Sequence, residues 1–172
     1  DDAIVVVDTG HAGMWMGGLY DLRTSAQSYM RSAGHLGWAF PAGIGAKAAC
    51  PERPVVVFTG DAGFWYHIAE VETAVRWNLA SVTVVNNNGG GNQSKRGFDR
   101  AYGGEQTAQA RELWTYNPMN FAKLAEDIGA FGIRVENASD IAPALAQAIA
   151  AKRPAVIDVA TDIEALAPTA VT

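Results

Sequence analysis

Cysteine is nearly absent from this sequence, since Cys50 is the single one among 172 residues. An internal disulfide is therefore excluded, and a cytoplasmic location is the simplest expectation. No apolar run approaches the roughly 20 residues that a membrane-spanning helix needs, so no membrane partner is expected. Lys and Arg number 13 against 18 Asp and Glu, and the resulting net charge of -5 argues against a nucleic-acid-binding surface.

Charged residues are also few, at 18%, while hydrophobic residues make up 49%, which is typical of a globular protein and not of a disordered one. The length fits one domain with a substantial core, so we expect a single domain over residues 1–172. The sequence has no initial Met and enters an apolar segment directly after Asp1 and Asp2. This beginning is what a fragment of a larger enzyme would have.

Five continuous apolar segments are predicted to form β-strands, at residues 3–7, 55–59, 82–85, 133–136 and 155–160. Continuous apolarity indicates strands that are buried on both faces, which is typical of parallel sheets. Helical patterns lie between them, at residues 41–49, 68–77, 120–128 and 139–151. This alternation predicts an α/β fold, a doubly wound and mainly parallel sheet flanked by helices.

Residues 89–117 interrupt the alternation, because they are polar, rich in glycine and poor in periodic apolar residues. We expect a long loop here. Loops of this length inside a compact domain are usually functional or disordered, and this one directly follows the most polar strand end of the chain.

Two strand ends carry the residues that indicate chemistry. Asp61 follows the strand at 55–59, and Asn88 follows the strand at 82–85, 27 positions later. A right-handed parallel crossover places the carboxyl ends of both strands at one edge of the sheet, where ligands of such sheets bind. A carboxylate, an amide oxygen and free glycine carbonyls suit Mg²⁺, which commonly keeps phosphate oxygens and water as its other ligands.

Each half of this pattern also has an ordinary interpretation. Gly60-Asp61-Ala62-Gly63 alone is a common turn from a strand to a helix, with Asp as the N-cap, and Asn86-Asn87-Asn88-Gly89-Gly90 alone is a common turn. The two halves at this spacing, each closing a buried strand, are much more specific. Backbone N–H groups of the first turn can then face a phosphate.

The combined pattern resembles the cofactor signature of thiamine-diphosphate enzymes. Gly60-Asp61-x-x-Phe64 followed by Asn87-Asn88-Gly89-Gly90 is most similar to the acetolactate synthase and oxalyl-CoA decarboxylase branch. The segments 8–15, 34–46 and 70–79 resemble the same branch, so the similarity covers essentially the whole chain.

The resemblance implies a set of binding residues. Mg²⁺ would be bound by the side chains of Asp61 and Asn88 and by the carbonyl of Gly90, while a register that uses Asn87 and Gly89 stays open. The other implied cofactor contacts are Gly10, His11, Ala62 and Gly63 for the diphosphate, the Gly34 carbonyl for the 4′-amino group, and Leu36 as the apolar side chain that keeps the cofactor bent.

The sequence departs from the family pattern at three places. Ala62 stands where glycine is usual, and Asn86 replaces an apolar residue, so the strand is expected to end early. Residues 91–93 lack the larger apolar side chains that line the acetolactate synthase pocket, which makes that substrate doubtful.

The resemblance also implies what the chain lacks. The activating Glu of this family lies on a pyrimidine-binding domain, usually in a partner subunit, and no acid here fits that role, so no catalytic residue is assigned.

The expected function is part of a 2-keto-acid decarboxylase or carboligase, in a homo- or hetero-oligomer. The alternatives are a naturally separate subunit of a two-chain enzyme and a non-catalytic phosphate- or nucleotide-binding regulatory module. Residues 10–13 do not match the glycine fingerprint of a dinucleotide site, which counts against a nucleotide.

Overall fold

The structure is a computed structural model and describes residues 2–167. The strands of these residues are β1 (Ile4–Val7), β2 (Ser28–Arg31), β3 (Val55–Gly60), β4 (Val82–Asn87), β5 (Phe131–Val135) and β6 (Ala155–Ala160). The helices are α1 (Gly10–Leu19), α2 (Ala39–Ala49), α3 (Asp61–Tyr66), α4 (Glu70–Arg76), α5 (Asn92–Ala101), α6 (Ala108–Glu112), α7 (Phe121–Ile128) and α8 (Ile141–Ala150). A 3₁₀ turn, Ala138–Asp140, precedes α8.

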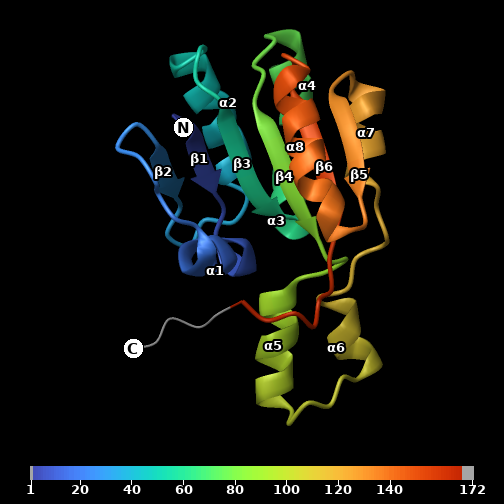
Figure 1. The fold of residues 1–172 in the computed structure, drawn as a ribbon. Coiled ribbons are helices and arrows are strands. Elements are labelled where there is room, and N and C mark those ends of the chain that lie inside the picture. Colours follow the sequence, from blue (N-terminus) through green and yellow to red (C-terminus); the bar gives the residue numbers. More distant parts are fainter. Residues whose placement is uncertain (1, 168–172) are drawn as a thin grey trace.

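The strands form one parallel sheet in the order β2-β1-β3-β4-β6-β5, with helices on both faces (Figure 1). This arrangement confirms the predicted doubly wound α/β fold. The strand order changes direction between β1 and β3. From β1 the chain continues to β2 at one edge of the sheet, and from β3 it continues to β4 on the other side. Ligands of open parallel sheets bind at such a point, outside the carboxyl ends of the strands.

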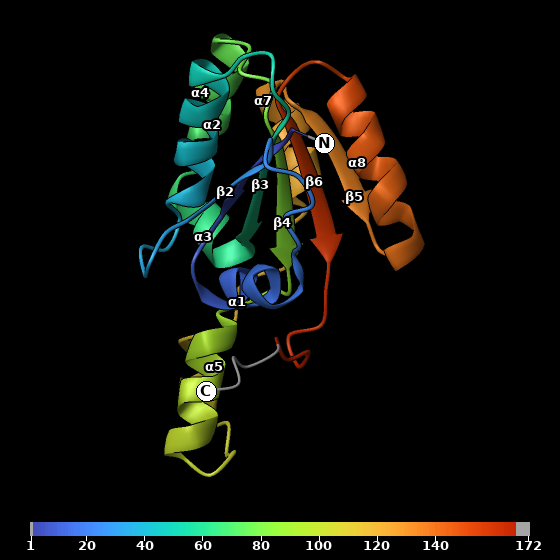
Figure 2. The same ribbon diagram turned by 60° about the vertical axis from the view of Figure 1, so that its left-hand side comes forward.

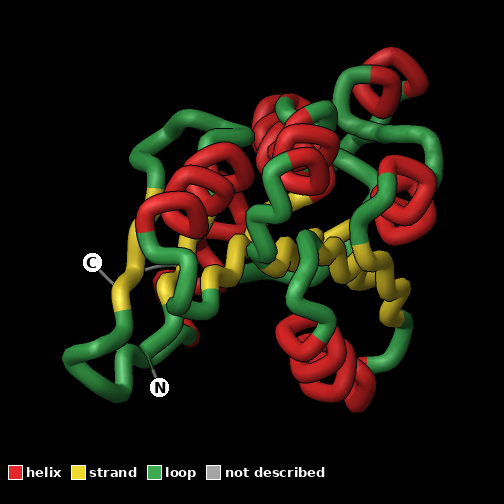
Figure 3. Tube along the Cα trace, turned by 90° about the horizontal axis from the view of Figure 1, so that it is seen from above, coloured by secondary structure: helices red, strands yellow, loops and turns green. Residues whose placement is uncertain are grey.

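Two apolar layers cover the sheet. On one face, α2, α4 and α7 pack together with Phe40, Phe64 and Phe121, whose rings meet edge to face at centroid distances of 5.0 and 5.5 Å. On the other face, α8 packs against β4, β5 and β6 (Figures 2 and 3). Within residues 2–167, no helix combines the length and the apolar character needed to cross a bilayer.

The strand predictions were mostly confirmed, with two corrections. β2 was missed, because Ser28–Arg31 is a short edge strand with intermediate or exposed residues and no β-branched side chain. The expectation that Asn86 ends its strand early was wrong, since β4 continues to Asn87. Pairing of Asn86 with Gly60 on one side and Val159 on the other supplies backbone hydrogen bonds that outweigh the poor strand propensity of Asn.

The helix predictions failed where glycine or polar residues dominate. α1 contains four glycines, and the predicted loop over residues 89–117 contains α5 and α6. These two helices project below the carboxyl edge of the sheet (Figure 1). The single helix expected over residues 68–77 is shorter, α4, and α3 precedes it. Helix α5 buries little besides Asn92, so it has no broad apolar stripe for sequence periodicity to reveal.

Two glycines of α2 offer a matched test of how closely this helix packs against β3. A Cβ atom on Gly43 would lie 2.1 Å from Val57 Cγ2, whereas a Cβ on Gly45 would meet nothing within 4 Å. We expect Gly43→Ala to lower the free energy of unfolding by about 1–3 kcal/mol or more through overpacking against β3. Gly45→Ala should raise it by about 0.5–1 kcal/mol, because alanine favours the helix. Denaturant unfolding of both variants tests this, and equal effects would contradict it.

Candidate functional site

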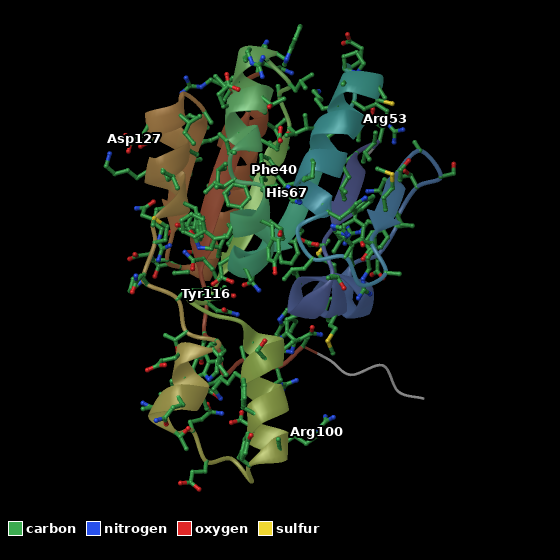
Figure 4. All side chains as sticks on the ribbon, turned by 180° about the vertical axis from the view of Figure 1, so that it is seen from behind. Phe40, Arg53, His67, Arg100, Tyr116 and Asp127 are labelled. Atoms are coloured by element: carbon green, nitrogen blue, oxygen red, sulfur yellow. The ribbon has the colours of Figure 1, made fainter. Side chains whose placement is uncertain are left out.

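A cavity of about 330 Å³ lies at the carboxyl edge of the sheet, between the strand ends and α5. Figure 4 places Tyr116, one of its lining residues, at the junction between the sheet layer and the projecting helices. The lining residues come from four segments far apart in the sequence: Thr9–Ala12, Leu36, Gly60–Gly63 with Tyr66, and Asn86–Tyr116 in part. These include eight of the nine predicted site residues, Gly34 being the exception.

A second cavity of about 350 Å³ lies at the opposite, amino-terminal edge of the sheet, with Lys47, Lys152 and Arg153 on its wall. None of the predicted site residues lines it. We place the functional site at the carboxyl edge, because the glycine turns and the buried Asp61 are both there.

Asp61 is the first residue of α3, and its side chain is only 3% exposed. Its Oδ1 accepts a hydrogen bond from the Ala62 N–H at 2.7 Å, and its Oδ2 accepts one from the Gly90 N–H at 3.0 Å. Burial raises the pKa of this carboxyl group, while the backbone N–H groups act in the opposite direction. A carboxylate held in this way is costly to ionise, and a cation beside it would offset that cost.

Asn88 and Asn87 face in different directions. Asn88 Oδ1 accepts from the same Gly90 N–H, at 3.2 Å, so it lies beside Asp61 Oδ2. Asn87 instead donates from Nδ2 to Asp158 Oδ1 and to the Met119 carbonyl, both at 2.9 Å, and it does not line the cavity. The Gly89 carbonyl already accepts from the Tyr116 N–H at 2.9 Å.

The first turn of α1 forms another wall of the cavity. Gly10 begins the helix with a φ of +77°, and the N-cap residue Thr9 provides no side-chain hydrogen bond, so the first N–H groups lack a side-chain acceptor. His11 is 8% exposed, and its Nε2 lies 3.3 Å from Arg96 Nη1 of α5. Because arginine only donates, Nε2 must accept, and the ring proton is then on Nδ1.

The charge of His11 follows from the same surroundings. Burial, and secondarily the Arg96 charge, lower the pKa of His11 below its usual value. This lowering of the pKa favours the neutral ring in the folded protein.

The loop between β2 and α2 carries the two remaining predicted residues. Leu36 is half-buried and lines the cavity, whereas Gly34 is exposed and does not. Both Gly34 and Gly37 have positive φ values, of +105° and +87°. The loop therefore presents Leu36 to the cavity and leaves Gly34 on the open side.

Within residues 2–167, no cluster of three or more His, Cys, Asp or Glu side chains could hold a metal ion. Asp61 is the one carboxylate on the cavity wall as described. A hard cation at this place would thus depend on amide, carbonyl and phosphate oxygens beside a single carboxylate, which is a donor set that suits Mg²⁺ bound with a diphosphate.

Sequence analysis did not predict several residues of the site. Tyr66 and Tyr116 line the cavity, and burial, with the nearby Asp61 and Tyr66, raises the pKa of Tyr116. Two fully buried carboxylates, Asp8 and Asp158, organise the strand ends around it. Of these four residues, only Asp8 could have been noticed in the sequence, because it is a polar residue directly after a predicted strand.

Asp158 fixes the end of β4. Its Oδ1 accepts from Asn87, and its Oδ2 accepts from the Phe121 N–H at 2.8 Å and from Arg134 Nη1 at 2.7 Å. It thereby links β4, β5, β6 and the start of α7. A buried carboxylate with three hydrogen bonds, one of which is also an ion pair, is well compensated.

Comparison with known proteins decides the family. The family described as "Thiamine pyrophosphate enzyme, C-terminal TPP binding domain" matches residues 8–159. The chain belongs to this family. Its fold agrees, since a solved Rhodococcus jostii RHA1 thiamine diphosphate-dependent 4-hydroxybenzoylformate decarboxylase superimposes with a TM-score of 0.80 at 30% identity, over 94% of this chain and 30% of that one.

Curated relatives lie in the expected branch. A 2-hydroxyacyl-CoA lyase of Arabidopsis thaliana is 40% identical over 120 residues, covering 69% of this chain and 21% of the relative. A probable acetolactate synthase of Mycobacterium bovis is 33% identical over 168 residues, covering 94% and 29%. A glyoxylate carboligase of Escherichia coli O157:H7 is 38% identical over 122 residues, covering 67% and 20%. The chain thus spans less than a third of the length of these relatives.

Proposed function

We propose that this chain binds the diphosphate and Mg²⁺ of thiamine diphosphate as one domain of a 2-keto-acid decarboxylase or carboligase. The observation that carries the proposal is the convergence of Asp61 Oδ2 and Asn88 Oδ1 on one backbone N–H, at the end of two neighbouring parallel strands. Membership of the family and the relatives named above support the cofactor and the class of reaction.

The residues present fit the cofactor. Asp61, Asn88 and the Gly90 carbonyl would hold Mg²⁺, since no hydrogen bond within residues 2–167 engages that carbonyl. Asn87 and the Gly89 carbonyl are both engaged elsewhere, which favours the Asn88 and Gly90 register.

The diphosphate would lie against the first turns of α1 and α3. Gly10 and His11 begin α1, and Gly63 lies in α3, so their N–H groups and the Nδ1–H of His11 are available donors. The Ala62 N–H already donates to Asp61 Oδ1, so Ala62 would meet the diphosphate through its place in the turn. Leu36 would support the bent cofactor from the apolar side. Gly34 would meet the cofactor's 4′-amino group only where the cofactor extends beyond this cavity toward a second domain.

The division of work follows from these contacts. Thiamine diphosphate supplies the electron sink for cleaving or forming the bond beside a keto carbon, and the protein supplies binding, orientation and electrostatics. This chain contributes the metal ligands and phosphate donors. A pyrimidine-binding domain or subunit with the activating Glu would complete the site in a cytoplasmic homo- or hetero-oligomer, acting on a small 2-keto acid or acyl substrate.

Binding of thiamine diphosphate is expected to require a divalent metal. The phosphates and the Asp61 carboxylate repel each other unless Mg²⁺ lies between them, so affinity should fall by about 100-fold or more when a chelator removes the metal. Isothermal titration calorimetry with Mg²⁺ and with excess chelator measures this. Equal affinity in the two conditions would exclude the metal site, and tight binding of a nucleotide with no binding of thiamine diphosphate would favour a regulatory module.

A further inference from the structure

Asp8 is a buried carboxylate that is neither a proposed metal ligand nor a proposed phosphate donor. It follows β1, its side chain is 0% exposed, and it forms no ion pair with any residue in the described part of the chain. Burying an unpaired carboxylate is costly unless hydrogen bonds offset the cost. Its partners therefore indicate what the charge stabilises.

Every partner of the Asp8 carboxylate is a donor. The Thr9 N–H donates to Oδ1 at 2.9 Å, and the Thr59 hydroxyl donates to Oδ2 at 2.8 Å. The Gly37 N–H is shared by both oxygens, at 3.1 and 3.0 Å. A carboxylate accepts at both oxygens, whereas an amide side chain would direct an NH₂ group at one of these donors.

These donors belong to three segments of the cavity wall. Thr9 precedes the first turn of α1, Gly37 follows Leu36, and Thr59 precedes the Gly60–Gly63 turn. A fourth contact is steric, because a Cβ atom on Gly63 would lie 2.3 Å from Asp8 Oδ2. The α3 turn therefore packs directly on the carboxylate.

The loop that carries Leu36 is tied to Asp8 through the Gly37 N–H. Gly37 has a φ of +87°, and a Cβ atom there would lie 2.8 Å from Tyr66 Cβ and 3.0 Å from the Gly63 carbonyl. The Gly37 N–H is thus held at Asp8 while its Cα lies against α3. Its neighbour Leu36 is fixed relative to the diphosphate turns as a result.

We propose that Asp8 is a positioning residue, which through Thr9, Gly37 and Thr59 holds the phosphate turns and the Leu36 loop at the spacing that thiamine diphosphate requires. The cofactor part of this inference rests on the function proposed above. Asp8 touches no cofactor atom in this role and acts only through the segments that it holds.

The first test uses Asp8→Asn and Thr59→Val in the native, full-length protein, with hydrogen exchange followed in the absence of cofactor. In Asp8→Asn the new NH₂ group can turn to the Thr59 hydroxyl, which has the Gly60 carbonyl as another acceptor at 3.2 Å, but the Gly37 N–H loses one of its two oxygens. We expect the Gly37 amide to exchange at least about tenfold faster in Asp8→Asn. Thr59→Val removes one donor of the same carboxylate and should leave Gly37 protected.

The second test measures thiamine diphosphate affinity by calorimetry at saturating Mg²⁺. Asp8→Asn should weaken it by at least about tenfold, and Thr59→Val should weaken it less. Unchanged affinity in Asp8→Asn, with wild-type protein that binds, would overturn the inference. Wild-type protein that does not bind would instead overturn the proposed function, while the exchange data would still decide whether Asp8 fixes the loop.

A measurement on the wild-type protein covers the case in which Asp8→Asn does not fold. Gly34 and Gly37 both have positive φ values and lie three residues apart, but Gly34 is exposed. The Gly37 amide should therefore exchange far more slowly than the Gly34 amide. Equal exchange rates would mean that Asp8 does not hold the loop.

Discussion

Asp61→Ala is expected to weaken Mg²⁺-dependent binding of thiamine diphosphate by about 100-fold or more, because it removes the one carboxylate on the cavity wall as described. Calorimetry at fixed Mg²⁺ measures the loss. Asp127→Ala is the matched control, because Asp127 lies on α7 away from the site and its side chain is 62% exposed (Figure 4). Affinity that is retained in Asp61→Ala would contradict the metal assignment.

Substitution of Asp61 should weaken cofactor binding, but it should not lower the free energy of unfolding of the metal-free protein. Burial raises the pKa of Asp61 above its value in the unfolded chain, so the folded protein binds this proton more tightly. The contribution of Asp61 to stability is therefore fully present below the unfolded pKa, and it is lost as the pH rises through the folded pKa. Asp61→Asn removes that penalty, so at pH 7 its free energy of unfolding should be unchanged or higher. A large loss of stability at pH 7 would show that the carboxylate is structural.

The same assays distinguish the two asparagines. Asn88→Ala should weaken Mg²⁺-dependent binding by about tenfold with little effect on unfolding, because the Asn88 side chain bonds only to the Gly90 N–H among the described residues. Asn87→Ala should instead lower the free energy of unfolding by about 1–3 kcal/mol, since it removes one of the hydrogen bonds of the buried Asp158 carboxylate and the bond to the Met119 carbonyl. The reverse pattern would favour the register that uses Asn87 and Gly89.

The proximity of Asp61 and Asn88 could be predicted because it depends on topology alone. Parallel strands bring their carboxyl ends to one edge, and the 27-residue spacing leaves room for one crossover. The structure places both oxygens within 3.2 Å of the Gly90 nitrogen. No detail of packing was needed for that inference.

The parts that could not be predicted depend on contacts distant in sequence. Helix α1 forms despite its glycines, and Gly13 lies so close to Arg31 and the Asp8 carbonyl that a Cβ atom would be within 2.6 Å of each. Helix α5 is held by the Lys95–Asp99 ion pair and by the bond of Arg96 to His11. The partner Gly37 lies 29 residues from Asp8, and only the fold shows that the two meet.

The other large effect concerns catalysis. We expect residues 1–172 alone to turn over pyruvate and other 2-keto acids at less than about a thousandth of the rate of the assembled enzyme, because general acid–base groups contribute factors of about 100 to 10,000. The one carboxylate described on the cavity wall, Asp61, is committed to the Ala62 and Gly90 N–H groups, and His11 is committed to Arg96. Among residues 2–167, no second acid lines the cavity to activate the pyrimidine ring.

Adding the pyrimidine-binding domain should restore turnover, and the same domain with its activating Glu changed to Gln should not. Calorimetry on residues 1–172 alone, with thiamine diphosphate and Mg²⁺, serves as the control that inactivity does not reflect an unfolded chain. Binding without turnover, followed by recovery with the second domain, is the expected pattern. Decarboxylation by pure residues 1–172 would mean that an activating group lies within the chain, and the two-domain division of the active site would then be wrong.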